Sequence, residues 1–167
     1  MRENHKKFLS HLDDSTEAVF IVALHLYNKG LDVRINAMQK AKSHKEWKSC
    51  KDDGDLYVYK NNKSYRIEVK GSGSDFECAK DWKYNSFIVC AKHSYDQAEP
   101  KPYAYMILNK ERTHVAIVKT STKNKWYSEY KMDRRYDNYG QEFYFCSPDI
   151  IEWRKLWNSQ DQSKTEY

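Results

Sequence analysis

The sequence predicts a mixed α/β fold, organised as one domain around a central sheet. Three observations lead to this expectation. An apolar helical segment comes first, several strand-like runs follow it, and a second helical pattern closes the chain. The 167 residues, 40% of them hydrophobic, are sufficient to bury a substantial core. We therefore expect a single domain over residues 1–157 and a flexible polar tail at 158–167.

Each expected element follows from its local pattern. Capped apolar runs predict helices, alternating apolar and polar residues predict strands, and clusters of glycine, serine and asparagine predict turns. In chain order we expect a leading helix or loose arm at 1–14, a buried helix from Ser15 to Lys29, a strand at 31–38, a loop at 39–53, a hairpin at 54–71, a turn and short helix at 71–86, strands at 87–91, 103–108 and 114–119, extensions of the sheet at 126–132 and 142–146, and a final helix at 149–157.

Composition and charge narrow the class of protein. The longest apolar run, residues 18–27, is too short to cross a bilayer, and the N-terminus lacks the pattern of a secretory signal. The four cysteines include no CxxC pair, which argues against a disulfide framework or a structural zinc site. We expect a protein of the reducing cytoplasm with no membrane partner. Its net charge of +5 is a mild bias toward polyanions.

The segment 54-GDLYVYKNNKSYRIEVKG-71 carries two acids and a lysine on strands that otherwise look buried. If the asparagine pair 61–62 forms a two-residue turn, Asp55 lies directly across from Glu68. A slip of two residues would instead bring Asp55 opposite Lys70. In either register the three side chains share one face of the sheet, because side chains alternate along a strand.

Two carboxylates held together must share a proton or be held by a cation. A hard divalent ion such as Mg²⁺ prefers oxygen ligands and fits such a pair. The ion would lower the pKa of a coordinated water, and Lys70 can orient or deprotonate that water and offset charge in the transition state. The chemistry that suits this arrangement is hydrolysis of a phosphodiester.

The pattern acid-x-lysine is common and has little weight alone, since it recurs at 46–48, 81–83 and 129–131. Glu68 differs from these because apolar residues flank it and an aspartate-bearing strand precedes it at hairpin distance. The alternative remains that Asp55 begins a strand, while Glu68 and Lys70 form a charge pattern on a solvated sheet face.

The arrangement of Gly54-Asp55, a hairpin and Glu68-Val69-Lys70 resembles the PD-(D/E)xK, or restriction-endonuclease-like, nuclease superfamily over roughly residues 15–92. The resemblance implies a restriction-endonuclease-like α/β core, with a central mixed β-sheet flanked by α-helices. It also implies cleavage of DNA with Mg²⁺, for which Mn²⁺ can substitute. Asp55, Glu68 and the Val69 carbonyl would be metal ligands, and Lys70 the catalytic lysine. Gly54 stands where the family has proline.

Several members of that superfamily carry another catalytic acid on the first core helix, and Glu17 is the candidate here. The alternative is a capping box in residues 14–17, in which Asp14 is the N-cap and Glu17 reaches back to its amide. The two roles are compatible if the start of the helix lies beside the catalytic edge of the sheet.

Basic residues near the acids are candidates for contacts with nucleic acid. A lysine-rich loop can follow phosphates, arginine among tyrosines suits base or stacking contacts, and a serine after the catalytic lysine can bond a phosphate. A solvated loop and ordinary turn chemistry are the alternatives. The candidates are Lys40, Lys42, Lys45, Lys48, Ser72, Arg134 and Arg135.

These inferences predict a Mg²⁺-dependent endonuclease that hydrolyses phosphodiester bonds in DNA, either as a site-specific enzyme of the homing or restriction type or as a structure-specific cutter. The expected partner is double-stranded DNA, and a homodimer is expected if the enzyme makes double-strand breaks. The alternative is a non-catalytic nucleic-acid-binding module that kept the nuclease fold.

Overall fold

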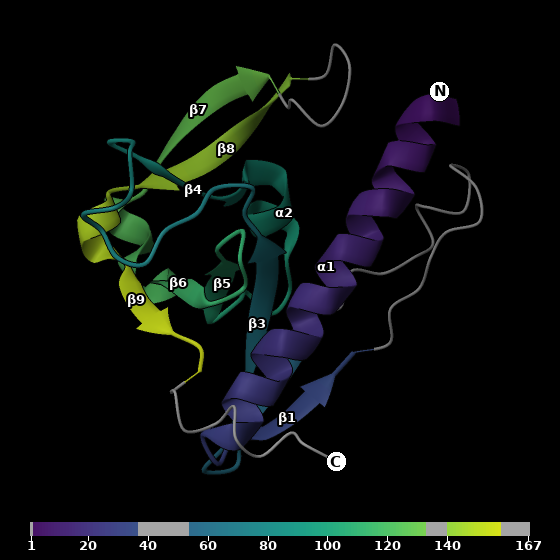
Figure 1. Ribbon diagram of the computed structural model, residues 1–167, viewed down its shortest axis with the longest axis vertical. Helices are drawn as coiled ribbons and strands as arrows, with labels where there is room; N and C mark the ends of the chain where they lie inside the picture. Colours follow the sequence, from purple (N-terminus) through teal and green to yellow (C-terminus); the bar gives the residue numbers. More distant parts are fainter. Residues whose placement is uncertain (1, 37–53, 133–139, 158–167) are drawn as a thin grey trace.

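The computed structural model of the chain describes residues 2–36, 54–132 and 140–157, with the side chains of 2–14 excepted. It is a mixed α/β fold dominated by strands (Figure 1). The elements are α1 (Arg2–Asn28), β1 (Asp32–Ile35), β2 (Leu56–Lys60), β3 (Lys63–Gly71), β4 (Phe87–Ala91), α2 (Lys92–Gln97), β5 (Ala104–Leu108), β6 (His114–Lys119), the 3₁₀ helix η2 (Thr120–Lys125), β7 (Tyr127–Met132), β8 (Gly140–Cys146), the 3₁₀ helix η3 (Pro148–Ile150) and β9 (Glu152–Lys155).

The larger of the two sheets is mixed and has the strand order β1-β2-β3-β5-β6-β9. Its one parallel pair is β3 with β5, and its other neighbours are antiparallel. The expectation of an α/β fold with a mixed central sheet is therefore confirmed. None of the described helices combines the length and the apolar character that a membrane span needs.

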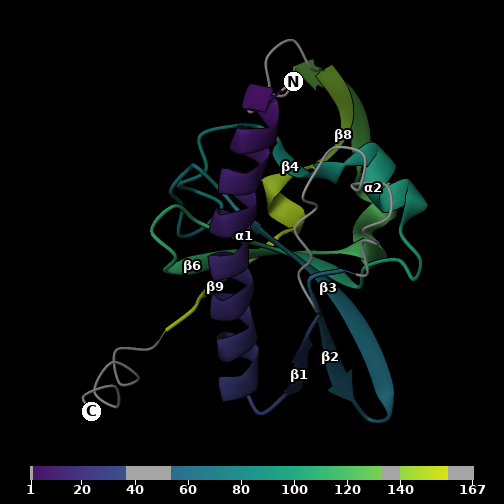
Figure 2. The ribbon, with the colours of Figure 1, turned by 90° about the vertical axis from the view of Figure 1, so that its right-hand side faces the viewer.

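Helix α1 packs against one face of this sheet, and Figure 2 shows the helix beside the long hairpin of β2 and β3. The helix faces the sheet with small and β-branched residues, which lets the two backbones approach closely. Side chains that point to this face form the first of two cores: Ala18, Val19, Val22, Ala23, Leu56, Val58, Ile67, Val69, Ala104, Met106, Leu108, Val115 and Leu156.

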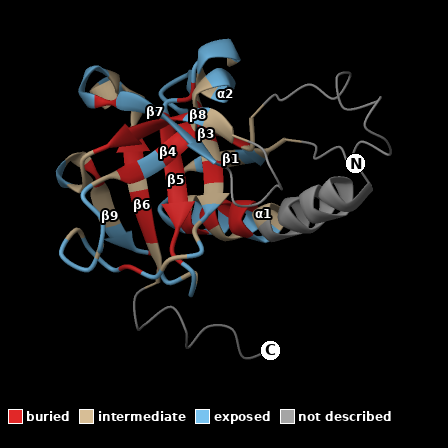
Figure 3. Cartoon of the chain, turned by 90° about the horizontal axis from the view of Figure 1, so that it is seen from above, coloured by how far each residue is buried: buried red, intermediate tan, exposed pale blue. Residues whose placement is uncertain are grey.

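The second sheet, with the order β4-β8-β7, covers the opposite face. Figure 3 shows buried residues gathered on the strands of both sheets where the two are stacked. The second core is rich in aromatic rings: Phe76, Phe87, Val89, Cys90, Tyr105, Ile107, Ala116, Val118, Trp126, Tyr144, Cys146 and Ile151. The expectation of one sheet that includes 126–132 and 142–146 was wrong, because β8 pairs with β4, and β7 pairs with β8, in a separate sheet.

The hairpin of β2 and β3 has the predicted turn. Asn61 and Asn62 adopt positive φ values of 51° and 58°, as a two-residue hairpin turn requires. Lys60 consequently pairs with Lys63, and the same register runs back to Leu56 opposite Ile67. One further step places Asp55 opposite Glu68, so the alternative slip of two residues is wrong.

The first helix is longer than predicted, because α1 begins at Arg2 and continues without interruption to Asn28. Asp14 is therefore not an N-cap, and the predicted capping box of residues 14–17 does not exist. The predicted C-terminal stop is confirmed: Gly30 follows the helix with a φ of 79° and donates its N–H to the Tyr27 carbonyl at 2.8 Å.

The predicted final helix at 149–157 is also wrong. Pro148 opens the short turn η3, which Ser147 caps by accepting the N–H of Asp149 at 3.3 Å. The chain then extends as β9 along the edge of the large sheet, where Glu152 bonds Lys119 of the neighbouring strand. Pairing with a free strand edge outweighs the helical periodicity of a short segment.

The short helix expected within 71–86 is absent as well, and this segment has no regular helix. Backbone hydrogen bonds join its start to β5 and to Lys110, and aromatic rings pack its middle. Phe76 is fully buried, and its ring lies 5.8 Å from that of Trp82 and 5.1 Å from that of Trp153. The Trp82 indole N–H donates to the Ser86 carbonyl at 2.9 Å.

A buried histidine near the end of α1 gives a first prediction. The His25 side chain is 8% exposed, and its Nδ1 lies 2.8 Å from the Leu156 carbonyl. Burial lowers the pKa of His25, against the opposing effect of this hydrogen bond. Below its ordinary pKa of about 6.5 the unfolded chain therefore binds more protons here than the folded chain does.

Stability should accordingly fall as pH falls from 7.5 through about 6.5. The measurement is urea unfolding at several pH values between about 5.5 and 7.5, which bracket that pKa. His25→Gln should reduce the slope of unfolding free energy against pH, whereas His93→Gln, at an exposed position, should leave it unchanged. Equal slopes for wild type and His25→Gln would refute this source of the pH dependence.

Candidate active site

The acid pair lies on the face of the large sheet that points away from α1. Alternation along β3 places Ile67 and Val69 toward the helix, so Glu68 and Lys70 point toward the second sheet. Asp55 immediately precedes β2 and shares this face. Its Oδ2 accepts the Val69 backbone N–H at 2.6 Å, which holds the carboxylate beside β3. Both acids are half-buried.

A buried arginine holds the second acid. The Nε of Arg66 donates to Oε1 of Glu68 at 2.7 Å, and the two side chains are 2% and 13% exposed. A second guanidinium nitrogen, Nη1, donates to the Pro100 carbonyl at 3.4 Å. Arg66 lies two residues before Glu68 on the same face of β3, so it supplies the cation that a buried carboxylate needs.

Gly54 explains how this arrangement fits together. Its φ is 80°, a conformation that glycine adopts easily, and a Cβ there would lie 2.5 Å from Nε of Arg66 and 3.0 Å from Oε1 of Glu68. Proline fixes φ near −65° and therefore could not occupy this position. The absence of proline before Asp55 is thus a structural requirement of the Arg66–Glu68 pair.

Lys70 lies on the same face of β3, two residues after Glu68. Its Nζ is 6.0 Å from the centroid of the Tyr105 ring, at the outer limit of a cation–π contact. Burial raises the pKa of the Tyr105 phenol, which therefore stays neutral. Cys90 of β4 lies close enough to hydrogen bond with Tyr105, and burial raises the pKa of its thiol. Lys70 is thus flanked by neutral groups on one side and by an acid on the other.

The oxygen atoms near Asp55 suit a hard divalent ion. The Val69 N–H points toward the flank where β2 begins, and in an extended strand the carbonyl of the same residue points to the same flank. The Asp55 carboxylate and the Val69 carbonyl therefore lie on the same flank of β3, while Oε1 of Glu68 is bonded to Arg66. No group of three His, Cys, Asp or Glu side chains gathers as a metal cluster in the described part of the chain.

Glu17 is not brought to this cluster. It lies on α1, which covers the opposite face of the sheet, and its Oε2 is 4.0 Å from Nε of Arg112. The Arg112 guanidinium also occupies the space beside Gly71, where a Cβ would lie 2.7 Å from Nη2. Glu17 thus lies near the C-terminal end of β3 through Arg112, and its catalytic role stays a prediction.

The remaining predicted contacts divide into two groups. Ser72 is within the described residues, and its hydroxyl accepts the Ser74 N–H at 3.0 Å, which is the turn chemistry that the glycine-serine sequence favours. The basic candidates Lys40, Lys42, Lys45, Lys48, Arg134 and Arg135 lie outside the described residues.

Sequence reasoning missed Arg66. The signal was present, because an arginine two residues before Glu68 must share its face of the strand. It was overlooked because a basic residue near a turn is usually solvated, whereas here the glycine before Asp55 opens the space in which the guanidinium is buried. Comparison with known proteins adds no further candidate, since neither a protein-family model nor a curated protein matches this chain.

Proposed function

We propose that the chain is a Mg²⁺-dependent endonuclease of the PD-(D/E)xK, restriction-endonuclease-like kind, and that it cleaves double-stranded DNA. The observation that carries this proposal is the position of Asp55 beside β3, where its Oδ2 accepts the Val69 N–H next to Glu68, with Lys70 on the same face of β3 as Glu68. A protein that gains nothing from a divalent ion has little reason to hold two acids this close, since like charges in cross-strand positions are destabilising.

In the proposed mechanism Asp55, Glu68 and the Val69 carbonyl hold the ion through oxygen atoms. When bound, Mg²⁺ polarises a phosphate oxygen and lowers the pKa of a coordinated water. Lys70 orients the attacking water and places a positive charge beside the phosphate as negative charge develops there. Arg66 would hold the Glu68 side chain in a fixed position through Oε1, so that its carboxylate is oriented before an ion binds.

One observation favours the alternative, a nucleic-acid-binding module without activity. The ion pair of Arg66 with Glu68 supplies positive charge to the acid without any metal. In such a module Arg66 would substitute for the ion permanently. The two proposals differ in a measurable way, because only the enzyme needs a divalent ion to act on DNA.

The test is incubation of purified protein with supercoiled plasmid and with branched DNA, in Mg²⁺, Mn²⁺, Ca²⁺ or EDTA. The enzyme should nick or linearise DNA in Mg²⁺ and Mn²⁺ and leave it intact in EDTA. A second-order dependence of linearisation on protein concentration would show that two copies act together. DNA binding in every buffer, without cutting in any of them, would overturn the proposed activity and favour the binding module.

A further inference from the structure

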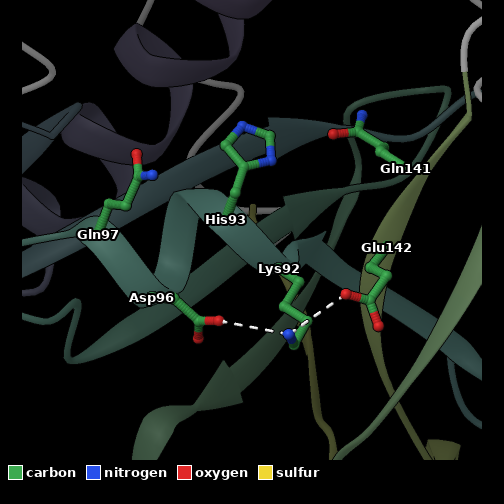
Figure 4. Close-up of a pocket in the computed structure, with 6 residues that line it drawn as sticks. All are labelled: Lys92, His93, Asp96, Gln97, Gln141 and Glu142. Carbon is green, nitrogen blue, oxygen red and sulfur yellow. Dashed lines mark hydrogen bonds and ion pairs between the residues drawn. The ribbon is translucent and has the colours of Figure 1, made fainter.

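A polar pocket lies between α2 and the start of β8, apart from the acid pair. Its volume is about 380 Å³, and Figure 4 shows side chains from the two elements facing one another across it. Small-molecule sites in proteins usually span about 300–1,000 Å³, so the pocket is large enough for a nucleobase. The lining residues are Lys92, His93, Asp96, Gln97, Gln141 and Glu142.

The charged residues of the pocket neutralise one another. Nζ of Lys92 lies 3.3 Å from Oε2 of Glu142 and 3.8 Å from Oδ2 of Asp96 (Figure 4). Both carboxylates of the pocket therefore engage its one lysine ammonium. Lys92 is thus not available to bind a phosphate inside the pocket, and phosphate sites need an excess of positive charge. The pocket favours a neutral ligand that forms hydrogen bonds.

The other lining groups supply such hydrogen bonds. The Gln97 amide carries N–H donors and a carbonyl acceptor, and His93 stands between it and the Gln141 side chain in Figure 4. An amide pairs in a bidentate manner with adenine, donating to N7 and accepting from the N6 amino group. Guanine presents two acceptors and is usually bonded by a free cation, whereas Lys92 is already held by two acids.

The walls of the pocket are fixed before any ligand arrives. The Tyr144 hydroxyl donates to Oδ1 of Asp96 at 2.9 Å, and the Lys123 ammonium lies 3.8 Å from the centroid of the Tyr144 ring. At the C-terminal end of α2, the ammonium of Lys101 donates to the carbonyls of Tyr95 and Asp96 at 3.0 and 2.7 Å. A short helix held in this way presents its side chains in a constant geometry, as selective recognition requires.

We propose that this pocket accepts an adenine base of the DNA, read chiefly by Gln97. The inference rests on the proposed function, because it takes the ligand to be part of the DNA that the chain cleaves. Metal-assisted attack on a phosphate does not depend on which base is attached, so the acids at Asp55 and Glu68 cannot select a sequence. The pocket would supply the base preference that these acids lack.

The test is selection from a library of DNA duplexes with a randomised central segment, in Ca²⁺ so that DNA is bound and not consumed. Wild type should enrich adenine at one position by roughly tenfold, as one bidentate base contact allows. Gln97→Ala should lose this enrichment. The control Asn124→Ala removes an exposed amide from η2, outside the pocket, and should retain it. Replacing the selected adenine by 7-deazaadenine should weaken wild-type binding to a similar extent.

A second readout is independent of duplex binding. Deoxyadenosine added to the protein should shift the NMR signal of the Gln97 side-chain amide, whereas thymidine should not. Equal base preferences in wild type and Gln97→Ala would overturn the proposed adenine site, and so would the absence of any response to deoxyadenosine. Either result would do so even if the protein cleaves plasmid DNA. If adenine enrichment depends on Gln97 but no DNA is cleaved in Mg²⁺, the proposed adenine site would stand and the proposed nuclease activity would not.

Discussion

Replacing Glu68 by glutamine is expected to reduce cleavage of plasmid DNA by about 10³-fold or more. The amide keeps the size and shape of the side chain but removes the charge that attracts a divalent ion. Lys70→Ala should cause a loss of similar order, because it removes the positive charge beside the phosphate while the acids remain. The measurement is the initial rate of nicking at saturating Mg²⁺.

The chain offers a matched control for this prediction. Glu129 and Lys131 of β7 repeat the acid-x-lysine pattern, with Nζ of Lys131 3.0 Å from Oε2 of Glu129, but every residue of that strand is exposed. Glu129→Gln and Lys131→Ala should cleave within about threefold of wild type, since Phe143 and not a second acid lies opposite Glu129. If the substitutions at Glu129 and Lys131 reduced the cleavage rate as much as those at Glu68 and Lys70, cleavage would depend on surface charge and not on the Asp55–Glu68 site.

Replacing Arg66 by methionine is expected to destabilise the fold strongly, by about 3 kcal/mol. The substitution removes one member of a nearly buried ion pair and leaves the Glu68 carboxylate without the bond at 2.7 Å. Removing one partner of such a pair costs more than the pair itself contributes, because a charge then stays buried. The measurement is the free energy of unfolding in urea at neutral pH.

A second arginine provides the comparison. Nη2 of Arg154 lies 3.6 Å from Oε2 of Glu152, but these side chains are 64% and 39% exposed. Arg154→Met should cost less than about 1 kcal/mol, because exposed pairs contribute little. The double change Arg66→Met with Glu68→Met should recover part of the stability lost in Arg66→Met. An Arg66→Met protein as stable as Arg154→Met would contradict the structural role of the buried pair.

The sequence was sufficient where local chemistry decides the structure. Asn61-Asn62 favours a tight turn, and that turn sets the register that brings Asp55 opposite Glu68. These features depend on a few neighbouring residues, and no distant contact competes with them.

The sequence was insufficient where distant contacts decide. Residues 149–157 have a helical period, yet the free edge of β6 takes them as β9. The strands β7 and β8 were assigned to the central sheet, yet they form a second sheet with β4, in the order β4-β8-β7. At the site itself, the buried Arg66 of β3 needs the space that Gly54 leaves beside it, and Gly54 lies before β2, twelve positions earlier in the chain.

The most direct test of the proposed site is calorimetric titration of Mn²⁺ into wild type and Glu68→Gln in the absence of DNA. Wild type should release the heat of saturable binding, Glu68→Gln should lose it, and Glu129→Gln should retain it. Identical titration curves for wild type and Glu68→Gln would contradict the proposed site, because Glu68 would then hold no ion.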